Sequence, residues 1–256
     1  MIINPFIYSV DATDPDAEAF IIATGITDVI QKSAINTLVV DLKGYSLWTK
    51  MDALYPFVGG TSTTHKYNLK NPLDTDVANR IVWSGGITHD ANGVTGNGVN
   101  GFGNTFLNDD SLSINDKHIS MYQRNILASP SASSMGTSKN RFYLDYSGDN
   151  YSTLGMIQSA FTIATPQKGM FIMSKIISGE FKYFQNSLTA VTKTGTNHVV
   201  LNLEHYVLAN NSATGPFDYS LTNLSFASLG SGLSATEVTD LRTSIETFQA
   251  TLSRNV

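Results

Sequence analysis

The chain is 256 residues long, carries a formal net charge of −5, has only 14% charged residues and contains no cysteine. This length can bury a sizeable core without covalent staples, whereas the lack of cysteine excludes disulfides, thiolate metal sites and a cysteine nucleophile. The acidic balance, with lysine and arginine scattered along the chain, argues against a nucleic-acid binder that works by bulk electrostatics. Serine, threonine and asparagine together make up 75 residues, which favours strands and turns over a helix-dominated fold.

No stretch of the sequence reaches the ~18 consecutive apolar residues that suggest a membrane span, so we expect no membrane insertion. The first residues, Met1–Phe6, lack the basic region and the long apolar stretch of a signal peptide. We therefore expect a soluble protein that is made in a cytoplasm and is not exported by the general secretory route.

Two helices are predicted near the N-terminus. The first begins at Asp14-Pro15, where an N-cap side chain precedes a proline at the first helical position, and it ends at Gly25. The second is capped by Thr27 or Asp28 and ends at Gly44. Its apolar residues repeat at a period near 3.6, which is typical of a helix with one buried face.

The segment after the second helix is predicted to form a further short amphipathic turn, ended by Pro56. Its apolar residues are Leu47, Trp48, Met51 and Leu54, and we expect Trp48 in the core. Within the second helix, Gln31 is placed to reach back to the main chain of the first turn.

From residue 57 onward, short apolar or alternating runs are separated by clusters of glycine, asparagine, serine, aspartate and proline. The candidate strands are His65–Leu69, Arg80–Ser84, His118–Arg124, Arg141–Tyr146, Phe161–Ala164, Met170–Ile177, Glu180–Gln185, Leu188–Thr192, His198–Leu203, His205–Ala209 and Leu224–Leu229. This spacing without helical crossovers predicts a β-sandwich or barrel. Residues 85–116 and the serine-rich residues 129–138 are expected to be loops, and 170–192 a run of hairpins.

The chain is predicted to end in a helix. Ser234 and Glu237 form a capping box, and apolar residues then repeat every three or four positions. These residues are Val238, Leu241, Ile245, Phe248 and Leu252. The stripe is too short for a coiled coil, so we expect it to cover a sheet or the N-terminal helices.

Short motifs with a chemical meaning are weak throughout the sequence. Gly96–Gly101 matches GxGxxG, but no strand-to-helix context surrounds it, so a nucleotide site is not expected. The histidines are His65, His89, His118, His198 and His205; none has metal-ligand spacing, although His198 and His205 flank Glu204. Ordinary strand-end histidines are the favoured interpretation.

Acidic and aromatic residues leave more alternatives open. Glu180 and Glu204 are the only glutamates on or directly beside predicted strands, and a glycosidase would need such a pair across a cleft. Asp109-Asp110 and Asp145–Asn150 are further acidic sites; the latter segment fits a Ca²⁺-binding turn or a plain Asx-turn. Trp83 and Tyr67 are candidate platforms for sugars, although the core is favoured for Trp83.

Two parts of the sequence resemble a family of tailed-bacteriophage virion proteins of the head-fibre, tail-fibre or appendage type. The first comprises Thr24–Asp28 with Gln31, Ser33–Leu38, Asp41–Gly44, Leu47-Trp48 and Tyr55–Gly60. The second comprises Phe226–Glu237 and Phe248–Leu252. Together they frame the chain from about residue 14 to residue 254.

The resemblance implies a mainly β protein: an antiparallel sandwich of the jelly-roll, concanavalin or laminin-G type with N-terminal helices and a C-terminal helix. We expect an arm and helical segment over 1–56 that docks or braces, a sandwich over 57–233 and a helix over 234–256 packed on it. The resemblance brings no catalytic residues, so no catalytic residue, metal site or cofactor is predicted and the ligand-binding residues stay open.

The function implied by the resemblance is that of a non-enzymatic structural component of a phage particle. Its expected partners are other virion proteins, further copies of itself in a dimer or trimer, and a host surface glycan, but not nucleic acid. Its expected location is the virion after synthesis in the host cytoplasm. The apolar residues 1–13 are expected to pack either on another chain by strand addition or on their own sandwich. A host-glycan lectin is the first alternative, and a polysaccharide hydrolase or lyase that uses Glu180, Glu204 or His205 is the second.

Overall fold

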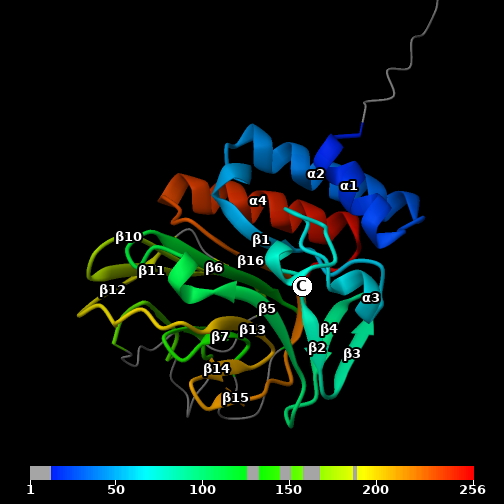
Figure 1. Ribbon diagram of the computed structural model, residues 1–256. Helices are drawn as coiled ribbons and strands as arrows, with labels where there is room; N and C mark the ends of the chain where they lie inside the picture. Colours follow the sequence, from blue (N-terminus) through cyan, green and yellow to red (C-terminus); the bar gives the residue numbers. More distant parts are fainter. Residues whose placement is uncertain (1–12, 126–132, 145–150, 158–167, 187–188) are drawn as a thin grey trace, which may run out of the picture.

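The computed structural model describes residues 13–125, 133–144, 151–157, 168–186 and 189–256, and it arranges them in three layers (Figure 1). A helical layer covers one face of a sheet, and a second sheet covers the other face of the first. The mainly β fold is that of a β-sandwich with added helices, as the sequence predicts. None of the helices in the described part of the chain is long and apolar enough to cross a bilayer.

The helices begin and end close to where their capping residues predict. They are α1 (Pro15–Thr24), α2 (Val29–Gly44), the short α3 (Ser62–His65) and α4 (Ala235–Thr251), with 3-10 turns η1 (Trp48–Lys50), η2 (Asp76–Ala78) and η3 (Asp109–Ser111). Asp14 caps α1 and Asp28 caps α2, each by accepting a hydrogen bond from a main-chain N–H of the first turn. Ser234 and Glu237 form the predicted capping box of α4. The side chain of Gln31, however, accepts from the N–H of Gly59 instead of reaching back into its own helix.

The first sheet lies directly beneath the helices. Its strands run in the order β12 (Val191–Thr194), β11 (Glu180–Gln185), β10 (Gly169–Ile177), β6 (Lys117–Gln123), β16 (Asn223–Gly230), β4 (Gly93–Gly96) and β3 (Ile87–Asp90), and β1 (Met51–Tyr55) also pairs with β16. All of these pairs are antiparallel.

The second sheet closes the sandwich from below. Its strands run in the order β15 (Gly215–Phe217), β14 (Asn210–Ser212), β7 (Met135–Thr137), β13 (Glu204–Val207), β5 (Phe102–Asn108) and β2 (Val82–Ser84). β8 (Asn140–Phe142) pairs with β7 and with β9 (Thr153–Leu154). The pairing of β7 with β14 is parallel, whereas the other pairs are antiparallel.

Two hydrophobic cores hold the three layers together. One lies between the helices and the first sheet, where Phe20, Leu38 and Phe248 meet Tyr122 and Phe226. The other lies between the two sheets. Successive residues of a strand point to opposite faces, so β10 sends Met170 and Ile172 to the first core and Phe171 and Met173 to the second. The C-terminal helix therefore covers both a sheet and the N-terminal helices.

The predicted helical turn over residues 51–54 is wrong, because Met51–Tyr55 form strand β1 against β16. Leu54 packs in the helical core and Tyr55 in the core between the sheets. Since both faces of this strand are buried, its apolar residues do not alternate with polar ones, and the pattern looks helical.

The predicted strand His65–Leu69 is also wrong. A capping box at Thr61 starts the short helix α3, which ends at His65, and the rest of the segment is a turn. The side chain of Asn68 explains the turn, because it replaces a strand neighbour by bonding the main chain of Leu54 and Ala78.

Residues 85–116, predicted as a loop, instead contain strands β3, β4 and β5. The glycines here permit close approach of neighbouring backbones: a Cβ on Gly93 would stand 2.1 Å from the carbonyl oxygen of Leu224, and one on Gly96 would stand 2.1 Å from that of Ser220. Glycine marks close packing in this segment, although a glycine-rich sequence usually indicates a loop.

Two further predictions need correction. Residues 198–203 form no strand, and His198 instead donates its main-chain N–H to Gly155. The serine-rich segment 129–138 contains strand β7 in its described part. The predictions for residues 1–12, for Phe161–Ala164 and for Asp145–Asn150 lie outside the described residues.

Candidate functional site

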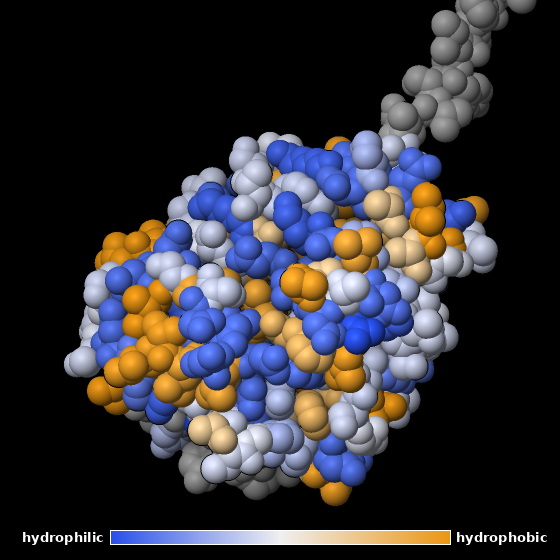
Figure 2. Space-filling model, in the orientation of Figure 1, coloured by the Kyte–Doolittle hydropathy of each residue, from blue (hydrophilic) through white to orange (hydrophobic). Residues whose placement is uncertain are grey.

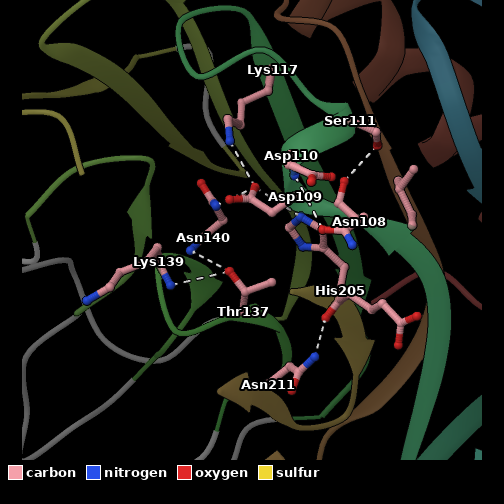
Figure 3. Close-up of polar contacts among 12 residues, drawn as sticks. Asn108, Asp109, Asp110, Ser111, Lys117, Thr137, Lys139, Asn140, His205 and Asn211 are labelled. Carbon is pink, nitrogen blue, oxygen red and sulfur yellow. Dashed lines mark hydrogen bonds and ion pairs between the residues drawn. The ribbon is translucent and has the colours of Figure 1, made fainter. Parts of the chain in front are cut away.

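A group of ionisable and polar side chains is enclosed between the two sheets (Figure 3). Asp109 opens η3 directly after β5, Lys117 begins β6, Asn140 begins β8 and His205 lies on β13. We call these four residues the Asp109 cluster. Each of them is at most 1% exposed, so the cluster is shielded from solvent.

One carboxylate oxygen is the centre of the cluster. Oδ1 of Asp109 lies 2.9 Å from Nζ of Lys117 and accepts a 2.6 Å hydrogen bond from Nδ2 of Asn140. Nε2 of His205 lies 3.4 Å from the same oxygen. Burial by itself raises the pKa of the Asp109 carboxyl, but His205 and Lys117 outweigh that effect, and the pKa is lowered overall. The carboxylate is therefore the ionised partner of a buried ion pair.

Local backbone structure positions Asn140, and a glycine leaves space beside both Asn140 and Lys117. The hydroxyl of Thr137 accepts hydrogen bonds from the N–H groups of Lys139 and Asn140, which fixes the turn between β7 and β8. Gly155 faces the cluster: a Cβ added to it would stand 3.6 Å from Oδ1 of Asn140 and 3.7 Å from Cε of Lys117. A residue with a side chain at position 155 would therefore contact both groups.

Some polar atoms of the cluster are unusual because they are buried without a partner. Within the described residues, no hydrogen bond reaches Oδ1 of Asn140 or Nδ1 of His205, and Nε2 of His205 has only its 3.4 Å contact with Asp109. Buried polar groups are ordinarily paired, and an unpaired one costs about 1–3 kcal/mol. The carboxamide of Asn140 thus has a free carbonyl oxygen next to a lysine and a carboxylate.

A second buried lysine lies on the neighbouring strand. Nζ of Lys175 on β10 donates to Oδ1 of Asn197 at 2.6 Å and to the carbonyl oxygen of Gly155 at 3.4 Å. Burial, together with the charge of Lys117, lowers the pKa of Lys175 to about 8. Unlike Lys117, Lys175 has no carboxylate among its hydrogen-bond and ion-pair partners in the described part of the chain.

A pair of histidines is also brought together, outside the Asp109 cluster. Nε2 of His65 accepts a hydrogen bond from the N–H of Gly60, so the proton of this ring is on Nδ1, which donates to Nδ1 of His89 at 3.1 Å. Burial, with help from His89 and Arg254, lowers the pKa of His65 to about 3, and burial lowers that of His89. Both rings are therefore neutral near pH 7. Their Nδ1 atoms share one proton, which leaves neither free to bind a ligand.

The outer face of the second sheet presents aromatic rings next to hydrogen-bonding groups. Phe102 on β5 stacks on Tyr206 on β13 with 4.8 Å between ring centroids, and Tyr219 lies 6.4 Å from Phe102. Beside them Nδ2 of Asn104 donates to Oε2 of Glu204 at 2.6 Å. All five side chains are partly exposed, and we call them the aromatic face.

The structure does not bring the residues of a hydrolase together. Glu180 lies on β11 of the first sheet, whereas Glu204 and His205 lie on β13 of the second. As neighbours on one strand, Glu204 points to the outer face and His205 into the interior. His198 lies between β12 and β13, where it is partly exposed.

The other candidates from the sequence occupy structural positions. Gly96–Gly101 joins β4 to β5, and Oδ1 of Asn97 accepts hydrogen bonds from three N–H groups of this turn; a strand follows it, not a helix. Trp83 packs on Phe57 and His89, while Trp48 is buried as expected. Asp110 is exposed. In the described part of the chain, no group of three or more histidine, aspartate or glutamate side chains is arranged to hold a metal ion.

Sequence reasoning missed Lys117 and Asn140, and it named Asp109 only as one of two adjacent acids. A signal was present, because Lys117 directly precedes a predicted strand whose apolar residues Ile119, Met121 and Tyr122 follow two to five positions later. A charged residue at the start of such a strand needs a partner, but the local sequence pattern does not indicate where in the chain that partner lies.

No model of a known protein family matches this chain, and no curated protein sequence matches it either.

Proposed function

We propose that this chain is a non-enzymatic structural component of a tailed-bacteriophage particle, as a head fibre, a tail fibre or a capsid or tail appendage. One observation carries the proposal: the two segments that resemble this family, far apart in the sequence, pack together. β1 pairs with β16, and α2 packs against α4 in the core above the first sheet. The resemblance therefore covers one continuous structural unit, which is what a shared fold would require.

The distribution of ionisable groups agrees with a structural role. The Asp109 cluster is closed to solvent, and its charges are matched inside the protein. An enzyme that cleaves a polysaccharide would need two catalytic carboxyl groups facing each other at an open cleft. Glu180 and Glu204, in contrast, lie on different sheets. This arrangement favours a structural role over the hydrolase alternative.

One side of the molecule has the character of a surface that packs against other chains. Figure 2 shows hydrophobic residues gathered on the side where β10, β11 and β12 lie in Figure 1. Ile176 and Ile177 at the end of β10 are about half exposed, and Val191 lies on the edge strand β12. Exposed apolar residues beside the edge strand of a sheet suit contact with other virion proteins or with further copies in a closed dimer or trimer.

The proposal is tested by locating the chain in the particle. Antibodies against the recombinant protein should label one defined position on purified virions in immunogold electron microscopy. Mass spectrometry of the same virions should detect the chain at a fixed ratio to the major capsid protein. If virions purified from an infected culture contain no peptide of this chain, the proposed role is wrong.

A second function, glycan binding, is favoured by the aromatic face. Sugars stack their apolar faces on aromatic rings and exchange hydrogen bonds with carboxylates and amides, and Phe102, Tyr206 and the Asn104–Glu204 pair offer both. A glycan array with the wild-type protein is the direct test. Tyr206→Ala should abolish any binding, whereas Tyr45→Ala, which removes an exposed tyrosine far from this face, should not. An array without hits would refute this second function and leave the structural role intact.

A further inference from the structure

We propose that Lys117 and Asn140 become joined by an intramolecular isopeptide bond, formed without an enzyme and promoted by Asp109. The bond would link Nζ of Lys117 to Cγ of Asn140. It would tie β6 of the first sheet to β8 of the second, across the interior of the sandwich. This inference concerns the covalent structure of the chain and does not rest on the proposed function.

The geometry of the Asp109 cluster supports the bond. Oδ1 of Asp109 receives Nζ of Lys117 at 2.9 Å and Nδ2 of Asn140 at 2.6 Å. The two nitrogens are therefore no further apart than the sum of these distances, about 5.5 Å. Since Cγ is bonded to Nδ2, rotations of the Lys117 and Asn140 side chains have to close a gap of at most a few ångströms to reach the roughly 3–3.5 Å from which attack occurs. Figure 3 shows Lys117 and Asn140 converging on Asp109.

The reaction balances without a further reagent. A proton passes from the Lys117 ammonium to the Asp109 carboxylate, which converts the ion pair into a neutral amine and a neutral carboxylic acid. The amine nitrogen then attacks Cγ of Asn140, and the carbonyl electron pair moves to Oδ1. When this pair returns, the bond from Cγ to Nδ2 breaks. The leaving nitrogen takes one proton from the attacking nitrogen of Lys117 and one from the Asp109 carboxylic acid, and it departs as ammonium. Asp109 ends as it began, so it acts as a proton carrier.

The surroundings favour this chemistry. Asp109, Lys117 and Asn140 are at most 1% exposed, and burial penalises both charges, which reduces the disadvantage of the neutral amine and acid against the ion pair. Oδ1 of Asn140 is buried without a hydrogen-bond partner among the described residues. A flip of the carboxamide, whose Nδ2 faces Asp109, would turn this oxygen toward the protonated Asp109, which would donate to it as negative charge develops. His205, 3.4 Å from Asp109, is placed to hold the carboxylate in position.

The chain contains its own control in Lys175. Nζ of Lys175 lies 2.6 Å from Oδ1 of Asn197, so it too has a carboxamide within reach. Its partners in the described part of the chain include no carboxylate to carry the proton. We therefore expect one cross-link and not two.

The test is the intact mass of the folded full-length protein. One isopeptide bond removes one ammonia, so the measured mass should lie about 17 Da below that of the sequence. Trypsin should fail to cleave after Lys117 and should release a branched peptide in which the dipeptide Asn140-Arg141 is attached to Lys117. Fragmentation of that peptide locates the bond.

Three variants separate the cross-link from other losses of ammonia. Lys117→Met and Asp109→Asn should restore the full mass, whereas Lys175→Met should keep the loss. An asparagine followed by glycine, as at Asn92-Gly93, also loses about 17 Da when it cyclises to a succinimide. That loss would persist in Lys117→Met and would show no branched peptide.

The outcomes are decisive in either direction. A folded wild-type protein that keeps its full mass after prolonged incubation overturns the proposal, and so does a loss that survives Lys117→Met or disappears only in Lys175→Met. Circular dichroism reports whether each variant folds. If Lys117→Met does not fold, the branched peptide of the wild-type protein decides alone.

Discussion

Arg254 near the C-terminus should be one of the most important residues for stability, although it is a charged side chain only two residues from the end of the chain. It is 2% exposed, and its guanidinium donates to the carbonyl oxygens of Pro56, Phe57 and Ser225 and to Oε1 of Gln249, at 2.8–3.2 Å. These acceptors belong to the segment after β1, to β16 and to α4. Arg254 therefore connects the helical layer to the first sheet.

The cost of Arg254→Ala follows from these bonds. Each hydrogen bond to a charged donor contributes about 1.5–3 kcal/mol, and burying the cation offsets several kcal/mol of their total. We expect the free energy of unfolding to fall by about 3–5 kcal/mol, as measured by urea denaturation.

Arg242→Ala is the matched control, because it removes another arginine from the same end of the chain. Among the described residues, Arg242 pairs only with Glu246, at 2.6 Å on the partly exposed side of α4. Such a pair contributes about 0.3–0.5 kcal/mol. If Arg254→Ala cost no more than Arg242→Ala, the connecting role of Arg254 would be wrong.

Three further perturbations follow from the same structure. Asn68→Ala should lower the free energy of unfolding by about 2–4 kcal/mol, because the buried amide bonds the main chain at Asp52, Leu54, Lys70 and Ala78; a loss below about 1 kcal/mol in urea denaturation would contradict this. Burial lowers the pKa of His118 to about 4 from 6.5. The unfolded chain therefore takes up a proton on His118 before the folded one does, and the free energy of unfolding should fall by about 3 kcal/mol between pH 6.5 and about 4. Denaturation of His118→Gln across this range should show a shallower pH dependence than that of the wild type, and an unchanged slope would refute the prediction. Ser234→Ala should cost about 1 kcal/mol by removing the cap of α4, which thermal unfolding would detect.

Capping chemistry explains why the helices could be predicted. A helix end is marked by side chains within three or four residues of it, as at Asp14, Asp28 and Ser234, so the information is local. The strands of the hairpin β10–β11 could be predicted for the same reason, since the turn at Ser178-Gly179 lies between them.

Long-range burial explains what could not be predicted. β1 is buried on both faces because α2 and α4 cover one side of the first sheet and the second sheet covers the other. The alternation that identifies a half-buried strand is therefore absent from its sequence. The glycines of β4 make a strand look like a loop in the sequence. They are needed because the backbone of a segment more than 120 residues away in the sequence packs closely against them.

The candidate site shows the same limit more sharply, because no two of its residues lie on the same strand or turn. Asp109, Lys117, Asn140 and His205 are ordinary residues in their local sequences, and only the stacking of the two sheets makes them neighbours. A sandwich without cysteine has no disulfide to join its sheets. The same stacking that hides the cluster from sequence patterns excludes water from it, and this exclusion is what allows a lysine, a carboxylate and a carboxamide to react with one another. An isopeptide bond between Lys117 and Asn140 would restrict the conformations of the unfolded chain as a disulfide does. The mass of the folded protein would reveal this bond directly.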